Sequence, residues 1–323
     1  MCGNKILSGT VGLLLAGVPV VQAAPYPEKP IRFVVAFAAG GSIDLLARLF
    51  AQKMTENLGQ QVVVDNRAGA GGNLSAEIAA RAAPDGYTIY ICSPSLVVNA
   101  ALYSKIAYDP VRDFAPVTVL ASVQNVLVAY PGFGAKSVKE LIALAKAKPG
   151  QINYGSTGSG SSGHLVMEMF RSQAGIELTH VPYKSVGQTT ADLISGQVSL
   201  WFPTIPGALP HIKGGRMRAL AVAGVRRSPA LPDVPTVAEA ASLSGFDATT
   251  WYAVLTPAGT PAAIVAKLHA AFLRVLRSPD VQERLAVQGV ESIGGTPEQA
   301  AAHIRGELPK WAKVVKAAGV RVE

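Results

Sequence analysis

The sequence predicts an α/β protein built from two domains. Short apolar runs rich in β-branched residues alternate with stretches of helical periodicity, a pattern typical of βαβ units around a mainly parallel sheet. The chain has 323 residues, and this length favours two cores because single cores stop growing at about 250–300 residues. Apolar residues make up 49% and charged residues 15% of the chain, as in compact globular proteins.

The first half of the chain is expected to hold five strands and an amphipathic helix. The expected strands cover residues 31–37, 61–65, 88–91, 117–120 and 126–130. Between the first two strands, apolar residues recur at helical spacing: Leu45, Leu46, Leu49, Phe50 and Met54. Charged side chains occupy the opposite face, so one face of this helix should pack on a sheet.

The alternation continues through the second half. A helix is expected over 137–147, where Ser137 and Glu140 have the spacing of a capping box. Strands are expected over 152–154, 178–181, 198–202, 218–223 and 250–255, and helices over 163–173, 185–195, 261–276, 281–288 and 297–318. The proline-rich run 228–235 should be an extended connector, because each proline biases its predecessor away from helix.

The order of these elements predicts a discontinuous first domain. If the terminal part packs on the first series of strands, domain 1 comprises residues 24–124 plus 227–323, and domain 2 comprises residues 125–226. The chain then crosses twice between the domains. Ligands in such sheets bind beyond the carboxyl ends of the strands, where loops lead into helices. We therefore expect a hinged cleft.

Residues 1–23 have the pattern of a secretory signal peptide. Lys5 precedes an apolar run over 6–21 that is interrupted by glycines and a proline and is too short to span a bilayer comfortably. Small residues follow, and cleavage is expected near Ala23. Cleavage would leave Cys92 as the single thiol of the mature chain, so no internal disulfide is expected.

Charge and motif spacing exclude several classes of function. The formal net charge is +8, but the Lys and Arg residues are scattered singly and do not cluster with aromatics, which argues against a nucleic-acid partner. A mildly basic surface favours anionic solutes. The histidines show no metal-ligand spacing, and no G-x-G-x-x-G is present, so neither a metal nor a cofactor is expected.

Two glycine-rich and hydroxyl-rich turns are the strongest candidates for a binding site. Each turn follows a strand and precedes a helix, so its unpaired N–H groups suit an anion. The first turn contributes Phe37, Ala38, Ala39, Gly40, Gly41, Ser42 and Asp44, with Ser42 as the expected helix cap. The second contributes Ser156, Thr157, Gly158, Ser159 and Ser161. Together they predict a carboxylate cradle, although each alone could be an ordinary turn.

Further candidates lie at the start of the helix after the second turn, in the strand at 198–202, or after other strands. These are Ser93, Ser95, His164, Tyr183, Trp201, Pro203 and Thr204. Tyr183 could stack on a ligand or could be a core aromatic. A secreted serine hydrolase using Ser159 or Ser161 with His164 is an alternative function, but neither serine lies at the centre of G-x-S-x-G.

The motifs, taken in order, resemble those of the periplasmic solute receptors of tripartite tricarboxylate transporters, the Bug family. The resemblance rests on residues 26–31, 37–41 with Asp44, 65–73, 83–88, 153–156, 180–184, 208–212 and 231–236. It implies a type II periplasmic-binding-protein fold with two lobes and a hinged cleft. It also implies a monomeric, periplasmic, non-enzymatic receptor that delivers a carboxylate to membrane permease subunits. A receptor that reports to a sensor kinase is a further alternative.

The resemblance also implies how the ligand is held. One carboxylate would lie between the loops 37–42 and 156–161, partly through ordered waters. Relatives often carry aspartates where Ser199 and Pro203 stand. Loss of the second aspartate predicts an amine-free acid, and Trp201 on the same strand face favours an apolar or aromatic one. Trp201 could equally be a core residue.

Overall fold

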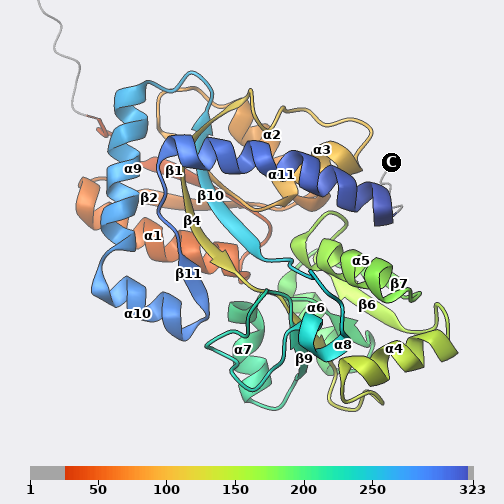
Figure 1. Ribbon diagram of the computed structural model, residues 1–323. Coiled ribbons are helices and arrows are strands. Elements are labelled where there is room, and N and C mark those ends of the chain that lie inside the picture. The colour runs from red at the N-terminus through yellow and green to blue at the C-terminus, as the bar shows by residue number, and fades with distance from the viewer. Residues whose placement is uncertain (1–25, 319–323) are drawn as a thin grey trace, which may run out of the picture.

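The computed structural model describes residues 26–318, which form two lobes, each with its own sheet and helices (Figure 1). The first sheet has the strand order β11-β4-β10-β3-β1-β2. Its strands are β1 (Ile31–Ala36), β2 (Val62–Arg67), β3 (Thr88–Cys92), β4 (Phe114–Val123), β10 (Thr250–Pro257) and β11 (Val290–Ser292). The expected signal peptide lies outside the described residues.

The second sheet has the strand order β7-β6-β8-β5-β9. Its strands are β5 (Val126–Ala129), β6 (Asn153–Ser156), β7 (Thr179–Pro182), β8 (Leu200–Trp201) and β9 (Arg218–Val222). Both sheets are mixed, whereas the sequence predicted mainly parallel ones. β1 pairs parallel with β2 and β3, but β10 pairs antiparallel with β3 and β4. The reason is topological, because β10 enters the first sheet from the second lobe.

Helices cover the first sheet on both faces (Figure 1). They are α1 (Ser42–Leu58), α2 (Asn73–Ala80), α3 (Ser95–Leu102), α9 (Ala262–Leu276), α10 (Pro279–Val287) and α11 (Pro297–Ala318), with a short 3₁₀ turn, η1, at Ala70–Gly72. α1 follows its apolar periodicity, since Leu46, Phe50 and Met54 are buried on one face. It ends at Gly59, whose φ of 69° is left-handed and therefore favours glycine.

The second lobe carries five helices. They are α4 (Val138–Ala147), α5 (Ser162–Ala174), α6 (Val186–Ile194), α7 (Ile205–Lys213) and α8 (Val237–Ala241). The expected cap of α4 is present, because the Ser137 side chain accepts a hydrogen bond from Glu140 N at 3.2 Å. The reciprocal half of the box differs, since the Glu140 carboxylate accepts from the backbone N–H of Lys136.

The second crossing between the lobes lies later in the chain than the sequence suggested. Val237, Phe246 and Ala248 are buried in a core of the second lobe, whereas the sequence analysis assigned everything after residue 226 to domain 1. The short helix α8 buries Val237 there, a contact that the proline-rich pattern did not reveal. We therefore place the crossings at 124–125 and near 249. Thr250 Oγ1 donates to Asn125 Oδ1 at 2.7 Å and ties the two crossing segments together.

None of the helices within residues 26–318 is long and apolar enough to cross a membrane.

Candidate functional site

Two adjoining cavities lie in the cleft between the lobes and share Phe37, Thr157 and Val186. The inner cavity has a volume of about 70 Å³ and is lined mainly by hydroxyl-bearing, aromatic and small side chains. The outer cavity has a volume of about 540 Å³ and is lined by residues of the loops on both lobes. Both lobes contribute walls to each cavity, so a bound molecule would contact both.

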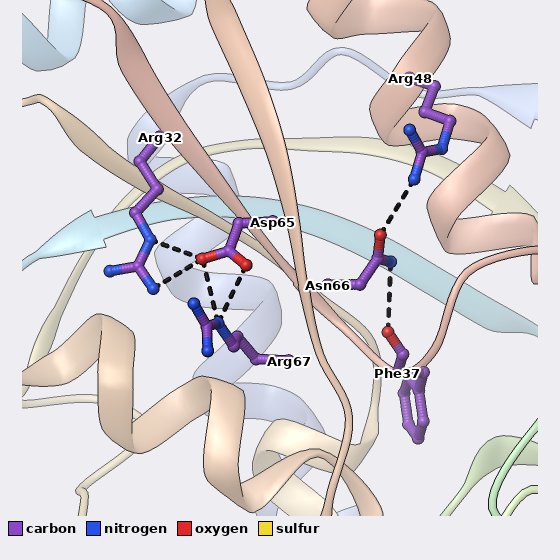
Figure 2. Close-up of polar contacts among 6 residues, drawn as sticks. All are labelled: Arg32, Phe37, Arg48, Asp65, Asn66 and Arg67. Carbon is purple, nitrogen blue, oxygen red and sulfur yellow. Dashed lines mark hydrogen bonds and ion pairs between the residues drawn. The ribbon is translucent and has the colours of Figure 1, made fainter.

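The first loop (Phe37–Gly41) is held in shape by side chains behind the cleft. Phe37 has a φ of 78°, which is uncommon for a non-glycine residue. Its carbonyl accepts a hydrogen bond from Asn66 Nδ2 at 3.3 Å, and Asn66 Oδ1 accepts one from Arg48 Nη2 at 3.1 Å (Figure 2). Arg48 Nε also donates to Asp44 at 3.1 Å. This network positions the loop against the cleft.

Asp44 serves the loop and does not line either cavity. Its Oδ2 accepts the backbone N–H of Gly40 at 3.0 Å. Burial by itself would raise the pKa of Asp44, but the hydrogen bonds from Gly40 and the Arg48 guanidinium outweigh it and hold the pKa below its ordinary value. Asp44 is therefore a charged anchor for the first loop.

Arg67, an arginine next to the glycine-rich run 68–72, is paired within its own lobe. Asp65 lies between Arg67 and Arg32 in Figure 2. Arg67 Nε is 2.9 Å from Asp65 Oδ1, and Arg32 Nη2 is 2.6 Å from Asp65 Oδ2. The Arg32–Asp65 pair links β1 and β2, whereas Arg67 and Asp65 both belong to β2, and Arg67 lines neither cavity.

Ser42 does not cap α1 as expected. Gly41 is the N-cap, and no side chain bonds to the free amides of the first turn. The Ser42 hydroxyl lies 2.5 Å from the Thr204 hydroxyl, which belongs to the other lobe. The difference follows from where the helix begins: Gly41 takes the cap position, so Ser42 is the first helical residue and its hydroxyl bonds across the cleft. The hydrogen bond ties the lobes together at the wall of the inner cavity.

The second loop (Thr157–Ser161) leads into α5. Ser161 is the N-cap of α5, yet its side chain makes no capping hydrogen bond. The residue is only 2% exposed, and its Oγ has no hydrogen-bond partner although it lines the inner cavity. A buried hydroxyl without a partner is costly. Ser161 Oγ is therefore available to a bound ligand.

His164 and Ser156 flank the second loop and line neither cavity. Gly160 N donates to His164 Nδ1 at 3.3 Å, and Ser156 Oγ is 2.6 Å from His180 Nε2. Burial, and then the nearby Arg171, lowers the pKa of His164 to about 4. His164 makes no hydrogen bond with Ser159 or Ser161, so the pair required by the hydrolase alternative is not formed.

The structure brings most of the predicted residues to the cleft. Those lining the inner cavity are Phe37, Gly41, Ser42, Ser93, Thr157, Ser161, Trp201, Pro203 and Thr204. Those lining the outer cavity are Phe37, Ala38, Thr157, Gly158, Ser159 and Tyr183. The remainder line neither cavity: Ala39, Gly40, Asp44, Ser95, Ser156 and His164. Trp201 is both a lining residue and a core residue: it borders the inner cavity, and its side chain, 3% exposed, packs in a core of the second lobe.

Sequence reasoning missed several lining residues. In the inner cavity they are Ile43, Ser162, Gly163, Val186, Phe202, Gly207 and Tyr252. In the outer cavity they are Ala68, Gly69, Ala70, Gly71, Tyr103, Lys184, Ser185 and Val186. The glycine-rich run at 68–72 was a usable signal. Tyr252 gave none, because every residue of β10 is buried and its sequence reads as core strand.

The charge of the lining favours anions. Among the described residues that line the two cavities, Lys184 is the one charged side chain, and no Asp or Glu is present. The inner cavity instead offers hydroxyls and the N-terminal ends of α1 and α5, where backbone N–H groups and the helix dipole favour negative charge.

Two lobes joined by two crossing segments, with a polar cavity between them, define a solute-binding receptor of the periplasmic-binding-protein fold. Residues 46–320 match the family model "Tripartite tricarboxylate transporter family receptor", and the chain belongs to this family. Protein BugT of Bordetella pertussis is 37% identical over 322 residues, covering 98% of each chain. Such receptors are not enzymes.

Two similar solved structures contain ligands. The structure "R. palustris Rpa4515 with adipate" has a TM-score of 0.88 and 38% identity, covering 92% of this chain and 99% of that one. MatC of Rhodopseudomonas palustris with bound malate has a TM-score of 0.84 and 34% identity, covering 90% of this chain and 100% of that one. These matches give no support to the hydrolase or to the sensor-kinase receptor.

Proposed function

We propose that this receptor captures a small, amine-free carboxylate in its cleft and delivers it to the membrane permease subunits of a tripartite transporter. The observation that carries the proposal is the partnerless, buried Ser161 hydroxyl at the start of α5, in a cavity whose other wall is the start of α1. Adipate and malate in the two similar structures support an acid as the ligand class.

The inner cavity suits one carboxylate group. An anion there would accept hydrogen bonds from Ser161 Oγ and from backbone N–H groups at the start of both helices. Hydrogen bonds to a charged acceptor contribute about 1.5–3 kcal/mol each, more than those between neutral groups. The small volume of about 70 Å³ leaves little room beyond the carboxylate and an ordered water or two.

Binding would favour the closed arrangement of the lobes. A ligand that bonds to α1 in one lobe and α5 in the other binds the closed form better than the open form, and the population shifts accordingly. The Ser42–Thr204 hydrogen bond adds to the same closed state. The permease could then distinguish the closed, ligand-bound receptor from the open, empty one.

The absence of an acidic lining residue supports the choice of an amine-free acid. Pro203 is buried and lines the inner cavity, where a carboxylate could otherwise pair with an ammonium group. An amino acid bound there would leave its ammonium group without a counter-charge, which is unfavourable in a desolvated site.

Export and assembly complete the proposal. Family membership supports a periplasmic location. We propose cleavage of residues 1–23 near Ala23 and a monomeric mature receptor. Mass spectrometry of the protein purified from the periplasm tests both, and an intact N-terminus or a stable dimer would contradict them.

A thermal-shift screen tests the ligand class. The mature protein should melt at a higher temperature with amine-free mono- or dicarboxylates, because a ligand that prefers the folded form stabilises it by mass action. Ser161→Ala should weaken binding of the same acids by about tenfold or more. Ser195→Ala, an exposed serine at the end of α6, is the matched control and should bind as the wild type does. Shifts by zwitterionic amino acids alone would contradict the proposal.

A further inference from the structure

We infer that the outer cavity holds the aromatic body of the ligand, so that the receptor selects an amine-free acid carrying an aromatic ring over a short dicarboxylate. This inference rests on the proposed function, since it requires the ligand carboxylate to occupy the inner cavity. It differs from the expectation drawn from Trp201, which lies in the wall of the inner cavity.

The first support is the volume of the outer cavity. About 540 Å³ lies within the range of about 300–1,000 Å³ typical of sites for organic ligands of appreciable size. A four-carbon dicarboxylate that already places one end in the inner cavity would leave most of this space to water. A ligand that fills it would exclude that water and bury apolar surface, which is favourable.

The second support is the chemistry of the walls. Aromatic rings come from both lobes: Phe37 and Tyr103 from the first, and Tyr183 from the second. Alkyl groups of Ala68, Ala70 and Val186 complete the apolar part of the lining. Aromatic pairs that meet offset or edge to face gain energy beyond that of apolar burial alone. A ring bound between rings of both lobes would therefore favour closure as well as affinity.

The third support is the charge of the outer lining. Among the described residues that line this cavity, Lys184 is the one charged side chain, and a cation is compatible with an anionic ligand.

The experiment compares four acids by isothermal titration calorimetry on the wild-type mature protein: 3-phenylpropanoate, 3-cyclohexylpropanoate, phenylalanine and malate. The inference predicts that 3-phenylpropanoate binds at least about tenfold more tightly than malate and phenylalanine, and severalfold more tightly than its cyclohexyl analogue. Tyr183→Ala should weaken 3-phenylpropanoate by about tenfold and leave malate within about twofold. Tyr183→Phe should bind as the wild type does, because only the hydroxyl is lost.

Each other outcome decides the matter. If malate binds as tightly as 3-phenylpropanoate, the inference is overturned while the proposed function stands. If the cyclohexyl acid equals the phenyl acid, aromatic selection is overturned. If none of the acids binds, the proposed function fails, and the inference fails with it. Tyr130→Ala, which removes a tyrosine of the second lobe that lines neither cavity, is the control variant and should bind every acid normally.

Discussion

Gly71→Ala provides a direct test of how the lobes close. Gly71 lies in the first lobe, and a Cβ placed on it would be 2.2 Å from the carbonyl oxygen of Ser159 in the second loop. Ordinary contact begins at 3.4 Å. The position of a Cβ is fixed by the backbone and the Ser159 oxygen is a backbone atom, so no side-chain rotation can absorb the substitution. The turn that contains Gly71 and the second loop must therefore move apart, and this movement opposes closure of the lobes.

The expected magnitude has two parts. Gly71 has a φ of 60°, so alanine there carries a backbone penalty of about 1 kcal/mol whether the lobes are open or closed. The clash with Ser159 exists only in the closed form and should weaken ligand binding. A closure penalty of about 1.4–3 kcal/mol corresponds to a loss of affinity of about 10- to 150-fold.

Gly175→Ala is the matched control. Gly175 also has a φ of 60°, but no atom lies within 4 Å of the position its Cβ would take. It should lose stability to a similar degree and keep its affinity for 3-phenylpropanoate. Calorimetry gives the affinities, and small-angle scattering gives the compaction on binding. Equal affinity and equal compaction in Gly71→Ala and Gly175→Ala would refute the close approach of Gly71 to the second loop.

Three further predictions follow. Asn66→Ala should weaken acid binding by about threefold to tenfold in calorimetry, because the first loop loses the hydrogen-bond donor to the carbonyl of Phe37, the residue with a left-handed φ. Unchanged affinity would show that the loop needs no such support. Thr204→Val should weaken binding by about tenfold through loss of the hydrogen bond to Ser42, and a variant that binds normally would exclude this hydrogen bond from closure. Burial lowers the pKa of His164 and of His180 to about 4, below the value of about 6.5 in an unfolded chain, so the unfolded chain binds more protons between these values. Their contribution to stability should be complete above pH 6.5 and fall as the pH drops toward 4, with urea midpoints that decline less in His180→Gln; a flat profile would contradict the burial of both rings.

Much of the fold could be predicted because its signals are local. The helix at residues 42–58 buries Leu46, Phe50 and Met54 of the predicted apolar stripe, although Leu45 is exposed, and Gly59 ends the helix. The position of the second crossing could not be predicted in this way. It depends on Phe246 packing into a core that other segments build, and that is a tertiary contact with no local pattern.

The same distinction between local signals and tertiary contacts separates the site residues that could be predicted from those that could not. Glycines and hydroxyls that precede helices could be recognised, and Gly41 and Ser161 do begin α1 and α5 at the cleft. Residues supplied by elements remote in sequence could not, as Tyr103 and Tyr252 show. The partner of Ser42 was also beyond local reasoning, since Thr204 lies 162 residues away.

A crystal structure of the mature protein with 3-phenylpropanoate tests the central claim most directly. The account predicts the ligand carboxylate in the inner cavity, within hydrogen-bond distance of Ser161 Oγ and of backbone N–H groups at the start of α1 and α5. Density for the carboxylate outside the cleft, or in the cleft with Ser161 Oγ still lacking a partner, would contradict it.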